Sequence, residues 1–170
     1  KIAICGYDGW HDWYLAAHLK KKDSLNEHLL PGLNPLGVPK GLKNTIFTFN
    51  YNNFEQLKRI VNENKDLAAI KLEPQRNELP KNDFLKKVRK LATDKKIILI
   101  IDECTSGFRE TLGGLHQKFN IKPDIAIYGK AIANGFPLTA IVGKREIMES
   151  AKNTFISSTF WSDRIGPVAA

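Results

Sequence analysis

An acid and a lysine follow two apolar runs in the middle of the chain. Asp102 ends the aliphatic run 97–101, and Lys130 comes after the shorter apolar run 125–128. A run that is apolar at every position is typical of a strand covered on both faces in a parallel sheet, where ligands sit beyond the carboxyl ends of the strands. An amine and a carboxylate at that edge could hold the two ends of one cofactor. Pyridoxal phosphate needs both groups, because its aldehyde binds a lysine and its pyridinium nitrogen pairs with a carboxylate.

The rest of the pattern predicts an α/β fold with a mostly parallel sheet, because strands and helices alternate along the chain. We expect strands at 1–6, 45–49, 66–72, 97–102, 123–129 and 138–143, and helices within 7–19 and at 53–63, 84–93 and 146–152. Residues 23–44 contain repeated proline and glycine turns without periodicity. They predict a long loop, and long loops in compact domains are often functional.

Length and composition are those of a globular protein. The 170 residues, with 42% apolar and 26% charged side chains, are enough for one α/β domain with a core. No run approaches the roughly 20 apolar residues of a membrane span, and the first residues predict a strand rather than a secretory signal. Cys5 and Cys104 each follow an apolar strand. We interpret them as reduced thiols in a cytoplasmic protein, with a disulfide as the less favoured alternative.

The chain is basic, with a net charge of +8 and a pI near 9.5. Its lysines gather at 20–22, 86–90 and 95–96. Such clusters mark either a nucleic-acid patch or a solvated helix face. No aromatic residues are interleaved with them, which favours solvated faces and a protein without a nucleic-acid partner.

Five segments, in order, resemble motifs of the class III pyridoxal phosphate aminotransferases of fold type I. They are GYDGWHD at 6–12, EPQRN at 73–77, IDECTSGFR at 101–109, PDIAIYGKAIANGFP at 123–137 and STF at 158–160. One such motif alone would be weak, but five in register over nearly the whole chain are specific. Among the branches of the family, these motifs most resemble those of the glutamate-1-semialdehyde 2,1-aminomutases.

The resemblance implies catalytic roles for two residues. Lys130 would form the Schiff base with the cofactor and, once released, act as a general base for the proton shift. Asp102 would pair with the pyridinium nitrogen. The competing interpretations are a lysine that solvates a strand end and an acid that caps a loop. A carboxylate after an apolar strand needs a cationic partner, which favours the cofactor.

The resemblance implies that four more residues contact the cofactor. Tyr7 would stack on one face of the ring, and Cys104 would pack on the other, where the family usually has valine. Thr105 would approach the phenolic oxygen. Thr159 would bind the phosphate across a dimer interface. Ordinary core packing is the alternative for the first two, and a threonine in a Ser/Thr-rich loop is the alternative for Thr159.

Other positions are near the active site in relatives or depart from them. Glu73 and Asn77 would lie beside the cofactor. Asp8 replaces a family histidine, which removes a donor, adds negative charge beside the cofactor and would tune substrate choice. Glu103 and Arg109 are expected to be structural, as a salt-bridged pair or as loop anchors. The histidines have no metal-ligand spacing, so no metal site is predicted at His11, His18, His28 or His116.

The resemblance also implies where these residues belong. Residues 1–170 would form the central part of the large cofactor-binding domain of a homodimer whose active site is shared across the interface. A phosphate-cradling segment would precede them and a small domain would follow, so residues 1–170 alone are expected to be inactive.

The expected activity is transfer of an amino group between small-molecule donors and acceptors. The first alternative is an intramolecular aminomutase that acts on an amino-aldehyde such as glutamate-1-semialdehyde. The second is a non-catalytic binding module of the same fold, which the presence of both Lys130 and Asp102 disfavours. The third is a basic nucleic-acid-binding domain, which would show a steep salt dependence of binding.

Overall fold

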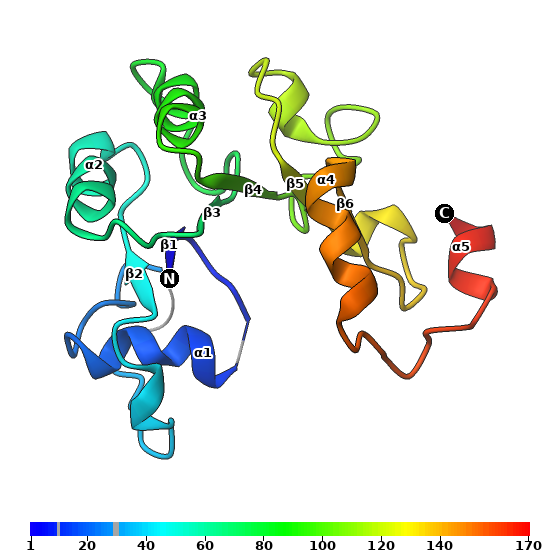
Figure 1. The fold of residues 1–170 in the computed structure, drawn as a ribbon. Coiled ribbons are helices and arrows are strands. Elements are labelled where there is room, and N and C mark those ends of the chain that lie inside the picture. Colours follow the sequence, from blue (N-terminus) through cyan, green and yellow to red (C-terminus); the bar gives the residue numbers. More distant parts are fainter. Residues whose placement is uncertain (10, 29–30) are drawn as a thin grey trace.

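The computed structural model describes residues 1–9, 11–28 and 31–170, and six strands of these residues form one sheet in the order β2-β1-β3-β4-β5-β6 (Figure 1). The strands are β1 (Ile2–Cys5), β2 (Ile46–Thr48), β3 (Ala69–Leu72), β4 (Ile98–Asp102), β5 (Ile125–Tyr128) and β6 (Ala140–Gly143). Neighbours from β2 to β5 pair in parallel, and β6 runs antiparallel to β5. The predicted α/β fold with a mostly parallel sheet is confirmed.

Among the described residues, four of the five α-helices lie close to the predicted positions, whereas no helix was predicted for the last one. The helices are α1 (Asp12–Leu15), α2 (Phe54–Glu63), α3 (Phe84–Asp94), α4 (Arg145–Met148) and α5 (Ile165–Ala169), with 3-10 turns at Ala16–Leu19, Lys40–Leu42, Leu115–Gln117, Lys130–Ile132 and Glu149–Asn153. Asn53 caps α2, because its side-chain oxygen accepts a hydrogen bond of 3.0 Å from the backbone N–H of Gln56. Among the described residues, none of these helices has the length and apolar character needed to cross a bilayer.

Two apolar clusters hold the layers together. On one face of the sheet, α2 and α3 bury Leu57 and Val88 against Leu72 and Leu99. On the other face, α1 and the described parts of the long loop (23–28 and 31–44) cover β1 and β2, in a second cluster made of Ile4, Tyr14, Ala16, Ala17, Leu25, Val38 and Ile46. Figure 1 shows α1 on the opposite side of the sheet from α2 and α3. The long loop therefore contributes to the core.

The described chain covers the apolar runs around β4 and β5 completely on one face and only in part on the other. Leu99 and Ile101 are buried under α3, whereas Ile98 and Ile100 are only half-buried. The same alternation occurs along β5. The cause is that α1 packs over β1 and β2, so the described chain covers this half of the second face only in part.

The order of the strands creates a point where the chain reverses direction across the sheet. From β1 the chain moves outward to β2, then returns to β3 on the other side of β1 and continues to β4 and β5. The segments that follow β1 and β3 therefore diverge, and ligands bind beyond the carboxyl ends of strands at such a switch point. Asp8, Glu73, Asp102 and Lys130 all follow or end strands at this edge.

Candidate functional site

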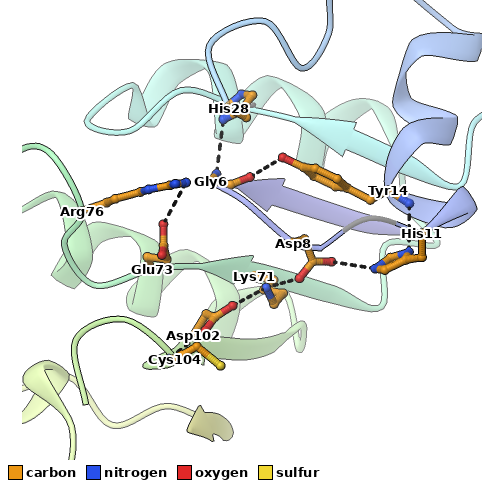
Figure 2. A network of polar contacts seen from close by, with 10 residues as sticks. All are labelled: Gly6, Asp8, His11, Tyr14, His28, Lys71, Glu73, Arg76, Asp102 and Cys104. Carbon is orange, nitrogen blue, oxygen red and sulfur yellow. Dashed lines mark hydrogen bonds and ion pairs between the residues drawn. The ribbon is translucent and has the colours of Figure 1, made fainter. Parts of the chain in front are cut away.

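Asp102 ends β4 with its side chain buried and hydrogen-bonded. Its Oδ1 accepts a hydrogen bond of 2.9 Å from the backbone N–H of Cys104, and its Oδ2 accepts one of 2.7 Å from Nζ of Lys71 (Figure 2). The side chain is 12% exposed. The sequence prediction that this carboxylate needs a cationic partner is met, within the described chain, by a lysine that the sequence prediction did not name.

Lys71 lies in the middle of β3, in register with Ile4 of β1 and Ile100 of β4. Its ammonium contacts the carboxylates of both Asp8 and Asp102. Burial disfavours the charged form, but the two carboxylates outweigh burial and raise the pKa of Lys71. The signal for this residue was available in the sequence, because a lysine inside an otherwise apolar strand must be paired.

Asp8 follows β1 and joins the same network. One of its oxygens contacts Lys71, and the other lies 3.9 Å from Nε2 of His11. His11 in turn accepts a hydrogen bond of 3.2 Å from the backbone N–H of Tyr14, at the start of α1. Asp8 is therefore linked to Asp102 through one lysine, Lys71.

Lys130 is exposed and begins the 3-10 turn after β5. Its backbone has a φ of +48°, in the left-handed region that side chains other than glycine seldom adopt. Such a conformation costs on the order of 1–3 kcal/mol and is concentrated at functional sites. Nζ of Lys130 donates a hydrogen bond of 3.2 Å to the hydroxyl of Thr105, so the structure brings these two predicted site residues together.

Cys104 links the end of β4 to the end of β5. A Cβ atom at Gly129 would lie 3.0 Å from Sγ of Cys104, so only glycine lets the thiol pack against the backbone that leads to Lys130. The thiol is half-buried, and burial followed by the charge of Asp102 raises its pKa. Cys104 is therefore a protonated, largely apolar contact at neutral pH.

Glu103 anchors the loop that carries Cys104 and Thr105. It is fully buried, and Oε1 accepts a hydrogen bond of 2.8 Å from the backbone N–H of His116 and lies 2.7 Å from its Nδ1. Ser106 donates to Oε2. Burial opposes ionisation, but these hydrogen bonds outweigh it and lower the pKa of Glu103.

Arg109 does not pair with Glu103. Its Nε donates a hydrogen bond of 2.6 Å to the backbone oxygen of Thr105 instead. The predicted alternative of a Glu103–Arg109 salt bridge is wrong, because Glu103 turns into the loop interior while Arg109 reaches back over the loop surface. Both residues act as loop anchors, which was the other alternative.

A cavity of about 730 Å³ opens at the switch point between β1 and β3. Its lining consists of Cys5, Gly6, Tyr7, Glu27, His28, Asn50, Tyr51, Glu73, Arg76, Asn77 and Glu78. The structure thus brings the predicted residues Tyr7, Glu73 and Asn77 to one cavity. Glu73 is buried, and burial raises its pKa. Its Oε2 accepts no hydrogen bond from the described residues and lies 3.7 Å from Nη1 of Arg76.

The turn after β1 is fixed through Gly6. Its N–H donates to Nδ1 of His28 at 3.2 Å, and its oxygen accepts a hydrogen bond of 2.6 Å from the hydroxyl of Tyr14 (Figure 2). Burial lowers the pKa of His28, so its ring is neutral and Nδ1 can accept. The ring of Tyr7 stands edge-on to Tyr14, with centroids 6.3 Å apart. These contacts position the residues that precede Asp8.

Two predicted elements of the site are not joined to it. Thr159 is exposed in a turn, and none of the described contacts connects it with the other predicted site residues, so its phosphate contact remains a prediction. Trp10, part of the first motif, lies outside the described residues. The described residues contain no group of three or more histidine, cysteine or acidic side chains placed to hold a metal ion.

Comparison with known families and sequences covers most of the chain. The family model described as "Aminotransferase class-III" matches residues 9–170. A 3-aminobutyryl-CoA aminotransferase of Cloacimonas acidaminovorans is 39% identical over 178 residues, which cover 100% of this chain and 39% of that protein. A glutamate-1-semialdehyde 2,1-aminomutase of Nitrosopumilus maritimus is 36% identical over 171 residues, covering 96% of this chain and 39% of that protein. The chain thus spans about two fifths of the length of these relatives.

Solved structures support the same fold. An omega-transaminase from Sphaerobacter thermophilus superimposes with a TM-score of 0.80 at 24% identity, covering 99% of this chain and 42% of that one. The FumI protein of Sphingopyxis sp. MTA144 gives a TM-score of 0.81 at 23% identity, covering 100% of this chain and 39% of that one. At this identity the likeness confirms the predicted fold type.

Proposed function

Because the chain belongs to the class III aminotransferase family, which depends on pyridoxal phosphate, we propose that it forms the cofactor-binding core of an enzyme that transfers an amino group. We place residues 1–170 in the central part of the large domain. The observation that carries the proposal is the position of Asp102 and Lys130 at the ends of neighbouring parallel strands, linked through Cys104 and Thr105.

The residues at this edge fit the cofactor. A carboxylate has about four lone-pair positions, and Asp102 uses one for Cys104 and one for Lys71, so it can still accept a hydrogen bond from a pyridinium nitrogen. Tyr7 and Cys104 would flank the ring, and Thr159 would reach the phosphate of a partner in a homodimer. When bound, the cofactor supplies an electron sink for the carbon that loses a proton.

Lys130 is the residue that would act on the substrate. Its exposed amine is held by the Thr105 hydroxyl in a strained backbone position, which orients it toward the edge where the strands end. In its neutral form the amine would hold the cofactor aldehyde. Once released, it would accept the proton removed from the substrate carbon and donate it to another carbon. Thr105 positions the amine for both tasks.

The cavity beside β1 and β3 would receive the substrate. Glu73, with its raised pKa and an oxygen that accepts no hydrogen bond from the described residues, is suited to exchange a hydrogen bond with a small amino donor or acceptor. Asn77 and Arg76 line the same space. The free thiols of Cys5 and Cys104 support a reducing compartment, and we place the protein in the cytoplasm.

A second candidate activity is intramolecular aminomutation. The similarity to the Nitrosopumilus maritimus protein favours it. Both activities use the same proton transfers by Lys130. They differ in whether a keto product leaves the site, and this difference can be measured.

The test is a single-turnover assay with the protein expressed from its complete reading frame and loaded with pyridoxal phosphate. Amino donors are offered one at a time without an acceptor. An aminotransferase releases about one keto product per site, an aminomutase converts an amino-aldehyde without releasing one, and Lys130→Ala does neither. Absence of both reactions across amino acids, amines and amino-aldehydes, with cofactor bound, would refute the proposal.

A further inference from the structure

Lys71 and Asp8 form a buried ionic pair that no step of the proposed reaction requires. We propose that they set the net negative charge beside the ring nitrogen of the cofactor. Lys71 is then a positioning residue for Asp102, and Asp8 balances part of the positive charge of Lys71. This inference deepens the proposed function and rests on the binding of pyridoxal phosphate.

The geometry makes the three residues one electrostatic unit. The ammonium of Lys71 contacts Asp8 on one side and Asp102, at 2.7 Å, on the other, and the three side chains are only 9%, 13% and 12% exposed (Figure 2). Charged groups this close interact strongly in a site that excludes most water. A change of charge at Lys71 or Asp8 should therefore alter the electrostatic potential at Asp102.

The charge count leaves the unit one cation short. Two carboxylates and one ammonium sum to one negative charge, and a buried net charge is costly unless it is paired. A protonated pyridine ring beside Asp102 would bring the sum to zero. The three side chains together therefore carry the single negative charge that would balance one bound monocation.

Lys71 stays charged in this position. Burial disfavours its ammonium, but Asp102 and Asp8 outweigh burial and raise its pKa. Other titratable groups face the unit from the neighbouring elements. They are His11 after β1, Tyr14 of α1, Glu73 and Arg76 after β3, Cys104 after β4 and Lys130 after β5. They are unchanged in the variants below and so enter every comparison equally.

The variants change the charge of the unit in opposite directions. Lys71→Met leaves two carboxylates and a charge of minus two, which should hold the ring proton more tightly. Asp8→Asn leaves Lys71 paired with Asp102 and a charge of zero, which should hold the ring proton less tightly. The double variant returns to minus one. A role in packing alone would not give shifts of opposite sign that cancel in the double variant.

The experiment measures the pH midpoint at which the ring nitrogen loses its proton, by NMR of bound pyridoxal phosphate labelled with ¹⁵N in the ring. The protein is expressed from its complete reading frame. One nearby charge moves such a midpoint by about one to three pH units. We expect the midpoint to rise by about one unit or more in Lys71→Met, to fall by about as much in Asp8→Asn, and to lie near the wild-type value in the double variant.

A matched ion pair on the surface provides the control. Lys90 and Asp94 lie 2.8 Å apart on α3 with side chains 76% and 52% exposed, so Lys90→Met and Asp94→Asn should leave the midpoint unchanged. Lys71→Arg, which keeps the charge, should also stay near the wild type. If Lys71→Met does not fold, Asp8→Asn against Lys71→Arg still decides, since only the former should lower the midpoint.

The outcomes separate this inference from the proposed function. If the wild type binds the cofactor, but Lys71→Met and Asp8→Asn shift the midpoint no more than the surface variants, or shift it in the same direction, the inference is overturned and the proposed function stands. If the folded wild type binds no pyridoxal phosphate, both are overturned.

Discussion

Glu103 provides the sharpest test of how the site is held in place. It follows Asp102, and its buried carboxylate accepts hydrogen bonds from the backbone N–H of His116 and from Ser106, and pairs with Nδ1 of His116. Replacement by alanine removes the acceptor and leaves these donors buried without a partner. The loop from residue 103 to 121 should then open more easily.

The expected size follows from these contacts. A hydrogen bond to a charged group contributes about 1.5–3 kcal/mol, and a buried donor left without its partner costs about 1–3 kcal/mol. Because the hydrogen bonds share one carboxylate, we take about 3–5 kcal/mol for the whole loss rather than their sum. Each 1.4 kcal/mol changes an equilibrium constant about tenfold, so the equilibrium constant for local opening should rise by a factor of about 10² to 10³·⁵.

Hydrogen exchange measured by mass spectrometry reports this opening directly. Backbone N–H groups of Gly107 and Phe108, hydrogen-bonded within the loop at 2.7 Å, serve as probes. The control is Glu110→Ala in the same loop, where the carboxylate is 50% exposed and pairs with Lys118. An exposed pair is worth about 0.2–1 kcal/mol, so exchange should rise less than about tenfold. Equal acceleration in Glu103→Ala and Glu110→Ala would show that the buried carboxylate of Glu103 does not hold the loop closed.

The pH dependence adds a second check on Glu103. Its pKa is lowered in the folded protein, so its stabilisation is present above the ordinary glutamate value of about 4.3 and is lost as the pH falls through the lowered value. Glu103→Gln should exchange faster than the wild type at neutral pH, and the difference should shrink below about pH 4. A difference that stays constant with pH would contradict the assignment of an ionised carboxylate.

Gly129, Cys5 and His28 can each be tested by a single substitution or reaction. Gly129→Ala places a Cβ atom 3.0 Å from Sγ of Cys104 and should destabilise the site by about 1–3 kcal/mol, measured as weaker cofactor binding. Cys104→Ala should partly restore binding, and Gly41→Ala, where no atom lies within 4 Å, should have no effect. Cys5, whose pKa burial raises to about 12, should resist alkylation at pH 8 in the native protein and react once it is unfolded, whereas rapid native alkylation would contradict its burial. Burial lowers the pKa of His28, so local stability around Gly6 should be present above about pH 6.5 and fall below it, and His28→Asn should remove this dependence in hydrogen exchange; equal pH profiles would count against it.

The order of the elements could be predicted because the local signals agreed with the fold. The apolar strands before Gly6 and Asp102, and the helical spacing after Asn53, were expected within a few residues of where they lie. Coverage of the second sheet face could not be predicted. It depends on which strands α1 packs over. The local sequence at Ile98 and Ile100 contains no information about the position of α1 on the sheet.

The site was predicted only in part. Asp102 and Lys130 were identified because a change from apolar to charged at a strand end is visible in the sequence. The pairing of Asp8 with Lys71 depends on the register between β1 and β3, which brings residues 63 positions apart together (71 − 8). A lysine within the apolar strand signals that a partner exists, but only the register shows which acid supplies it.

The proposed function depends first on whether Lys130 holds pyridoxal phosphate. The most direct measurement is borohydride reduction of the protein incubated with the cofactor, followed by mass spectrometry of its peptides, with Lys130→Ala and the exposed Lys152→Ala as comparisons. We expect a reduced cofactor adduct on the peptide that contains Lys130 in the wild type and in Lys152→Ala, together with loss of the visible absorption band on reduction. An adduct on another lysine would contradict the assignment of Lys130. The same visible absorption band in Lys130→Ala before reduction would also contradict it.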